Sequence, residues 1–327
     1  MSIPGKRVED CHYEFEDSTR GPPKILGKWE ALRLAVYDGS TGKFLGRTRS
    51  SWGVVGLFYL VFFSVLAVFC AICFEGLMLT INLQRPKWIL EESIIGTSPG
   101  LGFRPISDNT NEKSLIWYNA TNQTEVAIWT QRIDQFLNVY QNTSLFPDQG
   151  QHRQDCSDTE LPEPGKVCAF NFTDWDVCAP GGSYGYNDST PCFFIKLNRI
   201  YGWTPDYYTN DETLPEDMPR SLKDHIKSIN GSSLNSVWIT CSGQNPADRE
   251  VIGDIEYFPK NGRLPGYYYP YTNIPGYLSP LVAVHFPKAA KNIIINVECR
   301  AWAKNIRYNG VSLTREGSVH FAFMIDY

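Results

Sequence analysis

The sequence predicts a single-span type II membrane protein, with one transmembrane α-helix followed by a mainly-β sandwich ectodomain that contains one helix. Three observations predict this fold class. One long apolar run lies near residue 60, six glycosylation sequons all follow it, and hydrophobic residues alternate with period two toward the C-terminus of the 327-residue chain. We expect residues 1–51 to form a cytoplasmic tail, 52–81 a transmembrane signal-anchor helix, 82–110 an extracellular stalk and 111–327 the ectodomain.

The apolar run has no charged residue from Ser50 to Phe74. Its core, GVVGLFYLVFFSVLAVFCAICF, would span roughly 33 Å as a helix, which is enough to cross a bilayer. Because the 49 residues before it are polar, we interpret it as a signal-anchor rather than a cleaved signal peptide. Lys43, Arg47 and Arg49 crowd its N-terminal side, which favours a cytoplasmic N-terminus.

The sequons and cysteines indicate the same orientation. The six Asn-x-Ser/Thr sequons begin at Asn119, Asn122, Asn142, Asn171, Asn187 and Asn230. An even set of cysteines follows the membrane, as expected where disulfides persist: Cys156, Cys168, Cys178, Cys192, Cys241 and Cys299. These six permit 15 connectivities, and their spacing alone leaves the choice open. We expect Cys11, Cys70 and Cys73 to be free thiols.

The remaining elements follow in chain order. The tail is expected to be mostly disordered without a partner, and the Pro- and Gly-rich segment RPKWILEESIIGTSPGLGFRP to be an extended stalk. The segment TEVAIWTQRIDQFLNVYQ predicts a helix, because its large apolar residues recur at spacings of three and four. They are Trp129, Ile133, Phe136, Leu137 and Tyr140. Residues 200–236, rich in Pro, Asp and Asn, are expected to form a long surface excursion.

Three segments alternate with period two and predict strands. Their inward faces carry Val237, Ile239 and Cys241; Ile295, Val297, Cys299 and Ala301; and Val319, Phe321, Phe323 and Ile325. A disulfide between Cys241 and Cys299 would join two strands across a sandwich core.

Catalytic chemistry finds little support. The ectodomain has four histidines and lacks HExxH, CxxC and G-x-S-x-G spacings, so no cofactor, metal or nucleic-acid partner is expected. The one candidate is the pair Asp174 and Asp176, which could hold a divalent metal in a lumenal glycosyltransferase. Since the pair lies in a short segment between two cysteines beside a sequon, we interpret both residues as solvated loop acids.

Two groups of residues are candidates for binding a partner. In the membrane, one helical face carries Tyr59, Phe63, Leu66, Cys70 and Cys73. Farther along the same run, Glu75 either has a partner in the bilayer or reaches the headgroups. Outside, GYYYPYTN (266–273) cannot all be core if it is a strand, because Tyr267 and Tyr269 would share one face and Tyr268 the other. Exposed tyrosines are typical interface anchors, and a buried tyrosine corner is the alternative.

Several motifs in order along the chain resemble the β subunits of sodium/potassium- or proton/potassium-transporting P-type ATPases. They are FLGRTRSSW, LFYLVFF, PGLGFRP, GYNDSTPCFFIKLNRIYGWTP, GDIEYFPKNGRLPGYYYPYTN, LSPLVAVHF and VECRAWAKNI. The resemblance implies an immunoglobulin-like sandwich with sequential disulfides: Cys156 to Cys168, Cys178 to Cys192 and Cys241 to Cys299.

The same resemblance implies a non-catalytic subunit of the plasma membrane. Its partner would be a catalytic α subunit, whose folding, export and potassium affinity it supports, together with membrane lipid and a small single-span regulatory subunit. By position, Tyr59 and Phe63 match the aromatic pair facing an α transmembrane helix. Tyr268, Tyr269, Pro270 and Tyr271 match the tyrosine motif that contacts an extracellular α loop.

The chain also departs from the family pattern. Thr272 and Asn273 replace Tyr-Gly, Phe63 replaces tyrosine, Glu75 replaces a neutral amide, and YYTNDETLPEDMPR looks inserted. These departures make an orphan paralogue without an α partner one alternative function, and a cell-adhesion glycoprotein, which the same glycosylated sandwich could serve, is the other. The motifs do not decide between sodium/potassium and proton/potassium exchange.

Overall fold

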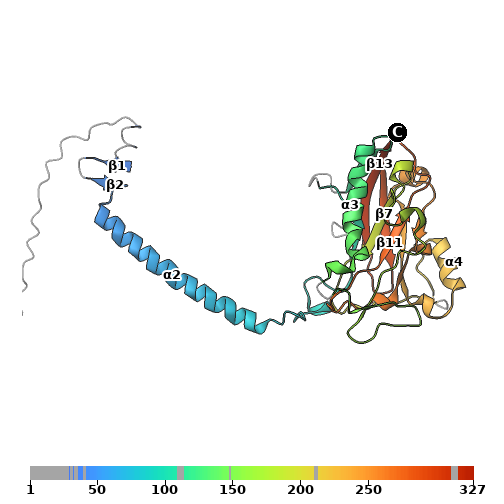
Figure 1. Ribbon diagram of the computed structural model, residues 1–327, viewed down its shortest axis with the longest axis horizontal. Coiled ribbons are helices and arrows are strands. Elements are labelled where there is room, and N and C mark those ends of the chain that lie inside the picture. The colour runs from blue at the N-terminus through green and yellow to red at the C-terminus, as the bar shows by residue number, and fades with distance from the viewer. Residues whose placement is uncertain are drawn as a thin grey trace, which may run out of the picture. The chain divides into compact units, whose positions relative to one another are not determined.

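The computed structural model describes residues 29, 32, 36–39, 42–108, 114–146, 149–209, 213–310 and 316–327. The chain forms two compact units, Met1–Thr80 and Ile81–Tyr327 (Figure 1). Cys11 and most of the predicted tail lie outside the described residues.

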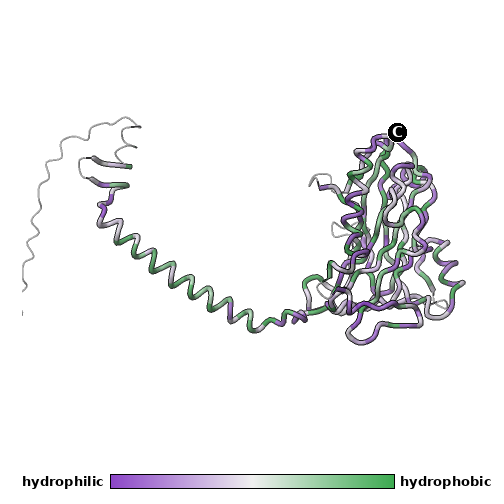
Figure 2. Tube along the Cα trace, in the orientation of Figure 1, coloured by the Kyte–Doolittle hydropathy of each residue, from purple (hydrophilic) through white to green (hydrophobic). Residues whose placement is uncertain are grey.

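The first unit contains the membrane helix α2 (Arg49–Thr80), close to the predicted boundaries. Within the described residues it is the one helix long and apolar enough to cross a membrane, which confirms the predicted single span. Figure 2 shows its hydrophobic colouring along most of its length. At about 1.5 Å per residue it is about 48 Å long, against a hydrocarbon core of about 30 Å, so it can tilt or extend into the interface.

A short antiparallel pair precedes α2, where the sequence predicts mostly disorder. It consists of β1 (Tyr37–Asp38) and β2 (Lys43–Phe44). The Trp52 indole N–H donates to the Phe44 carbonyl at 2.7 Å, which ties the pair to the first turn of the helix. The prediction of disorder is therefore wrong for these residues.

The second unit is a two-sheet sandwich with the predicted mainly-β composition. The five-stranded sheet has the order β10 (Arg263–Pro265), β8 (Ser236–Gly243), β12 (Ile295–Trp302), β13 (Ser318–Asp326) and β4 (Leu115–Asn119). The four-stranded sheet has the order β3 (Leu101–Arg104), β7 (Cys192–Leu197), β11 (Leu281–His285) and β9 (Glu256–Phe258). A separate parallel pair is formed by β5 (Arg153–Gln154) and β6 (Val167–Cys168).

The core lies between the two sheets and is rich in aromatic rings. Phe193 of β7 meets Phe321 of β13 with ring centroids 4.7 Å apart, and Phe103 of β3 meets Phe321 at 4.9 Å. The inward residues predicted for β8 and β12 are buried in this core, as are Phe321, Phe323 and Ile325 of β13, while Val319 is partly buried against it.

Helices cover both outer faces of the sandwich. The predicted helix is α3 (Gln123–Gln141), which buries Trp129, Ile133, Leu137 and Tyr140 as expected. The ring centroid of its Phe136 lies 6.5 Å from that of Phe194, whose side chain is on the outer face of β7 in the four-stranded sheet. Figure 1 shows α3 beside this sheet and α4 (Arg220–Ser228) on the other side of the unit.

Three predictions about this unit need correction. Residues 200–236 are not only a surface excursion, because α4 and its flanks bury a second apolar cluster against Trp238 and Trp302. Together with α5 (Pro246–Val251), α4 brings the described α-helices of this unit to three rather than the predicted one. Leu101–Arg104, expected in the stalk, forms edge strand β3 because Leu101 and Phe103 alternate into the core.

The disulfides pair as the resemblance implies: Cys156 with Cys168, Cys178 with Cys192, and Cys241 with Cys299. The third bridge, however, does not cross the sandwich. Cys241 and Cys299 are directly opposite each other on neighbouring strands β8 and β12 of one sheet, with Cα atoms 4.0 Å apart. Both side chains point to the core face, which alternation predicts correctly, but alternation does not say which strands are neighbours.

Candidate partner-binding site

The predicted aromatic pair of the membrane helix forms a stacked unit. The rings of Tyr59 and Phe63 lie 5.9 Å apart at an interplanar angle of 22°, as expected for residues four apart on a helix. Both side chains are at least half exposed. This unit of the chain therefore presents a preformed aromatic ridge to its surroundings.

A second pair of the same geometry lies one residue earlier. Phe58 and Phe62 stack at 6.1 Å and 16°, and Phe58 meets Tyr59 edge-on at 5.4 Å. One residue of helix corresponds to a rotation of about 100°, so the second pair points in a different direction. Phe58 and Phe62 are not part of the helical face predicted from Tyr59 and Phe63.

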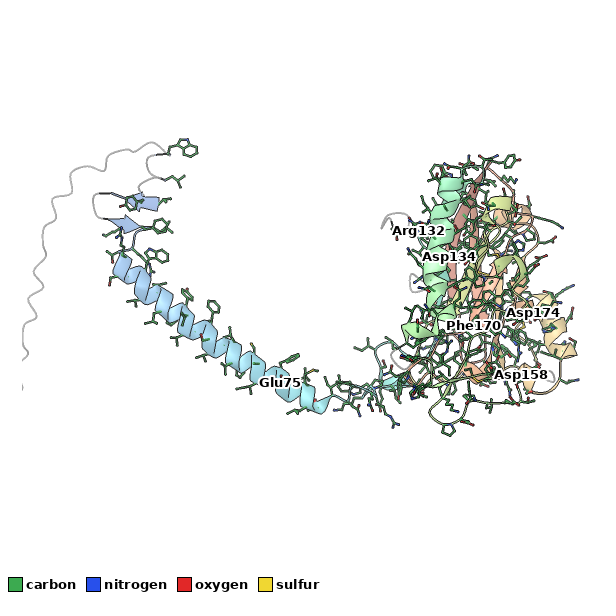
Figure 3. All side chains as sticks on the ribbon, viewed as in Figure 1. Glu75, Arg132, Asp134, Asp158, Phe170 and Asp174 are labelled. Atoms are coloured by element: carbon green, nitrogen blue, oxygen red, sulfur yellow. A yellow bond between two sulfur atoms is a disulfide. The ribbon has the colours of Figure 1, made fainter. Side chains whose placement is uncertain are left out.

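The rest of the predicted helical face is present. Leu66 and the free cysteines Cys70 and Cys73 are exposed on α2. Glu75, labelled near the end of α2 in Figure 3, follows Tyr59 by sixteen residues, a rotation of roughly 160° on an ideal helix. Glu75 therefore lies on nearly the opposite side of the helix from the Tyr59 ridge.

In the ectodomain, the tyrosine segment is not a strand. It follows β10 and begins with the 3-10 turn η7 (Gly266–Tyr268). Gly266 is required there, since a Cβ atom would lie 2.3 Å from the Tyr207 hydroxyl and 2.6 Å from the Asn235 carbonyl oxygen. The Gly266 amide donates to that same Asn235 carbonyl at 2.8 Å, which fixes where the tyrosines begin.

The first two residues of the matched motif point inward. Tyr268 is buried, and its hydroxyl donates to the Ala169 carbonyl at 3.0 Å. Tyr269 meets the Trp203 ring edge-on at 5.5 Å, with its hydroxyl oxygen inaccessible. Burial raises the pKa of both tyrosines well above the usual value. These two side chains hold the segment onto the fold.

The second half of the motif lies at the surface. Pro270 is exposed and Tyr271 is half-buried, with Thr272 and Asn273 exposed after them. The Tyr271 hydroxyl donates to the Asn273 side-chain oxygen at 2.9 Å. Asn273, one of the departures from the family pattern, thus orients Tyr271 directly.

A supporting cluster beneath Tyr271 was missed by sequence reasoning. The ring centroids of Tyr271 and Tyr277 lie 4.9 Å apart. The Arg199 guanidinium carbon lies 5.4 Å from the centroid of the Tyr271 ring and 5.2 Å from that of the Tyr277 ring. Arg199 also donates to the Ser279 hydroxyl at 3.1 Å. Burial raises the pKa of Tyr277 to about 12. No local pattern signals this cluster, because it joins segments almost 80 residues apart.

The six predicted glycosylation residues all reach the surface. Asn119 is half-buried and the other five are exposed. Three of them accept hydrogen bonds from both the amide and the hydroxyl of the sequon Ser or Thr: Asn119, Asn142 and Asn171. Asn122 instead caps α3 and donates to Glu125 at 2.7 Å.

The two candidate carboxylates lie at the surface of the ectodomain. Asp174 and Asp176 are exposed in the turn before η3 (Asp176–Cys178) and at its start. In the part of the chain that the structure describes, no three His, Cys, Asp or Glu side chains are grouped to hold a metal ion. Figure 3 labels Asp174 in the ectodomain.

Comparison with known proteins gives concordant matches. Residues 23–321 match the family model described as sodium/potassium ATPase beta chain. The chain is 44% identical over 323 residues to the Drosophila melanogaster protein named sodium/potassium-transporting ATPase subunit beta-2, covering 98% of this chain and 99% of that one. It is 43% identical to the beta-1 subunit of the same species, over 91% and 94% of the two chains. The chain is 28% identical to the human sodium/potassium-transporting ATPase subunit beta-2, covering 93% of this chain and 96% of the human one.

Proposed function

The chain belongs to the sodium/potassium ATPase beta chain family, and we propose that it is the non-catalytic subunit that assembles with a catalytic α subunit of a Na+/K+-ATPase. ATP hydrolysis and ion transport would then be carried out by the α subunit. The observation that carries this proposal is the extent of the match, which includes the membrane helix and all three disulfide pairs of the ectodomain.

We propose that the Tyr59–Phe63 ridge packs against a transmembrane helix of the α subunit. Helix association in lipid depends on van der Waals packing and interhelical hydrogen bonds rather than on the hydrophobic effect. A pair of rings already stacked at 5.9 Å loses little side-chain entropy on binding. Phe63 contributes no hydroxyl, so Tyr59 is the one member of the pair that could donate a hydrogen bond.

In the ectodomain, Pro270 and Tyr271 are proposed to meet an extracellular loop of the α subunit, with Tyr268 and Tyr269 holding them in place. A half-exposed tyrosine supported by Arg199 and Tyr277 is a rigid anchor of the kind found at interfaces. The two surfaces belong to one chain, so the second contact would form at high effective concentration once the first had formed.

We further propose a type II orientation in the plasma membrane, with the N-terminus in the cytoplasm. The basic residues Lys43, Arg47 and Arg49 at the N-terminal side of α2 support this orientation, as do the three disulfides of the second unit. Binding would stabilise the α subunit, permit its export and adjust its potassium affinity. Membrane lipid and a small single-span regulatory subunit are the remaining proposed partners.

Capture of this chain from native membranes in mild detergent, followed by mass spectrometry, tests the proposal. Recovery of a P-type ATPase α subunit at about equal molar amount is the expected result, and the identity of that subunit would name the exchanged ions. Delivery of this chain to the cell surface with no α subunit recovered in several detergents would contradict it. That result would favour the adhesion or orphan-paralogue function.

A further inference from the structure

A cavity of about 220 Å³ lies directly beside the sequon at Asn171. Asn171 and Thr173 themselves line it, and both are exposed. The Asn171 side-chain oxygen accepts from the Thr173 amide at 2.9 Å and from its hydroxyl at 2.6 Å. The asparagine side chain is therefore held in one orientation at the edge of the cavity.

The walls of this cavity are largely aromatic. They include the buried Trp175 and Tyr268 and the half-buried Phe170 and Tyr267. Phe170 lies edge-on to Trp175 at 5.5 Å, and Tyr267 lies 4.8 Å from Tyr268. Sugar rings pack their C–H faces on aromatic side chains, so these walls suit a carbohydrate.

A polar group is also present for sugar oxygens. Arg263 lines the same cavity, and its position is fixed because its Nε donates to the Ser236 hydroxyl at 2.8 Å and its guanidinium pairs with Asp158. A few fixed polar groups among apolar walls are the usual composition of a small-molecule site.

We propose that the first N-acetylhexosamine of a glycan on Asn171 packs in this cavity. The occupant is indicated by covalent continuity, because the attachment atom belongs to a residue that lines the cavity. Attachment makes docking intramolecular, so even a weak sugar–aromatic contact would be well populated. The inference rests on the proposed orientation of the chain, which places Asn171 in the compartment where N-glycosylation occurs.

The docked sugar would decide which side of the tyrosine segment is open to a partner. Tyr267 and Tyr268 line the cavity and would lie beneath the glycan, whereas Pro270 and Tyr271 are not among its lining residues. The glycan would thus leave the Pro270–Tyr271 end as the accessible end for an α-subunit loop.

Site-resolved deglycosylation of the full-length protein tests this inference. The native protein, in detergent and in complex with whatever co-purifies, is treated with an amidase that cleaves the glycan–asparagine bond and converts Asn to Asp. Release at each site is then followed by mass spectrometry. Asn142, at the end of α3, is the matched control, since it is equally exposed and has the same side-chain hydrogen bonds but does not line this cavity. We expect release at Asn171 to be at least tenfold slower than at Asn142, and equal to it after denaturation.

The variant Tyr267→Ser tests whether the cavity is the cause of the slow release at Asn171. Tyr267→Ser removes a half-buried wall of the cavity and should bring release at Asn171 to within about twofold of Asn142, while release at Asn142 stays unchanged. Equal native rates at the two sites, or an unmodified Asn171 beside a modified Asn142, would overturn the docked glycan and leave the pump-subunit proposal intact. Absence of glycans from all six sequons would overturn the docked glycan together with the proposed orientation.

Discussion

The hydroxyl of Tyr268 donates a 3.0 Å hydrogen bond to the carbonyl oxygen of Ala169, 99 residues earlier in the chain. Ala169 follows Cys168, which is bonded to Cys156, so this contact ties the tyrosine segment to a disulfide-closed loop. Because Tyr268 is also buried, it serves the fold of the unbound chain. The motif is thus divided between residues that hold the segment and residues that face solvent.

This division predicts that Tyr268→Ala is primarily a folding defect. Truncating a large buried aromatic side chain costs about 3–5 kcal/mol, whereas Tyr268→Phe removes one hydrogen bond and costs about 1 kcal/mol. Chemical unfolding of the purified chain should rank the variants in that order. A Tyr268→Ala variant with unchanged stability but lost α binding would show that Tyr268 is instead a direct contact.

A bulky charge next to Pro270 should impair binding without impairing the fold. Thr272 is exposed, so Thr272→Arg adds no buried charge, and we expect a change in stability within about 0.5 kcal/mol. Recovery of the α subunit should fall several-fold, because the new side chain would stand at the proposed contact. Gln244→Arg, at an exposed position between β8 and α5, is the matched control and should leave recovery unchanged. Equal recovery with both variants would place the α contact elsewhere on the ectodomain.

The two aromatic pairs of α2 provide an internal comparison. Tyr59→Ala with Phe63→Ala should reduce recovery of the α subunit by at least fivefold, since it removes the proposed contact ridge. Phe58→Ala with Phe62→Ala removes the same kind of stacked pair from a face rotated by about 100° and should reduce recovery much less. Equal losses in both variants would mean that general helix hydrophobicity, rather than one face, supports assembly.

Sequence periodicity predicted the local elements of this chain well. Spacings of three and four located α3 and its buried face, and alternation identified the core faces of β8, β12 and β13. The stacked geometry of Tyr59 and Phe63 also follows from their spacing alone. In each case the signal lies within one segment, which is the range over which periodicity carries information.

Periodicity did not predict the contacts between segments that are distant in the sequence. Alternation showed Cys241 and Cys299 facing the core, yet the order of strands in the sheet decides that they are neighbours. Likewise α4 buries Leu222 and Ile226 against Trp238, although the polar composition of its surroundings suggested a loop. Alternation assigns the tyrosines to two faces only if they form a strand, but the close approach of Gly266 to Asn235 turns the chain and so changes which rings are buried.

The Cys241–Cys299 bridge should be required for export. It closes the longest of the three disulfide loops, with a sequence separation of 58, which on the chain-entropy model corresponds to about 4 kcal/mol. That is a large share of the roughly 5–15 kcal/mol stability of a typical domain. Cys241→Ala with Cys299→Ala should therefore leave the chain in the endoplasmic reticulum with immature glycans, as measured by endoglycosidase sensitivity. Gln244→Arg, at an exposed position outside both proposed contact surfaces, is the control and should mature at the normal rate. Mature glycans on the first variant at the level of the second would show that the sheet forms without its bridge, because hydrogen bonding between β8 and β12 then suffices.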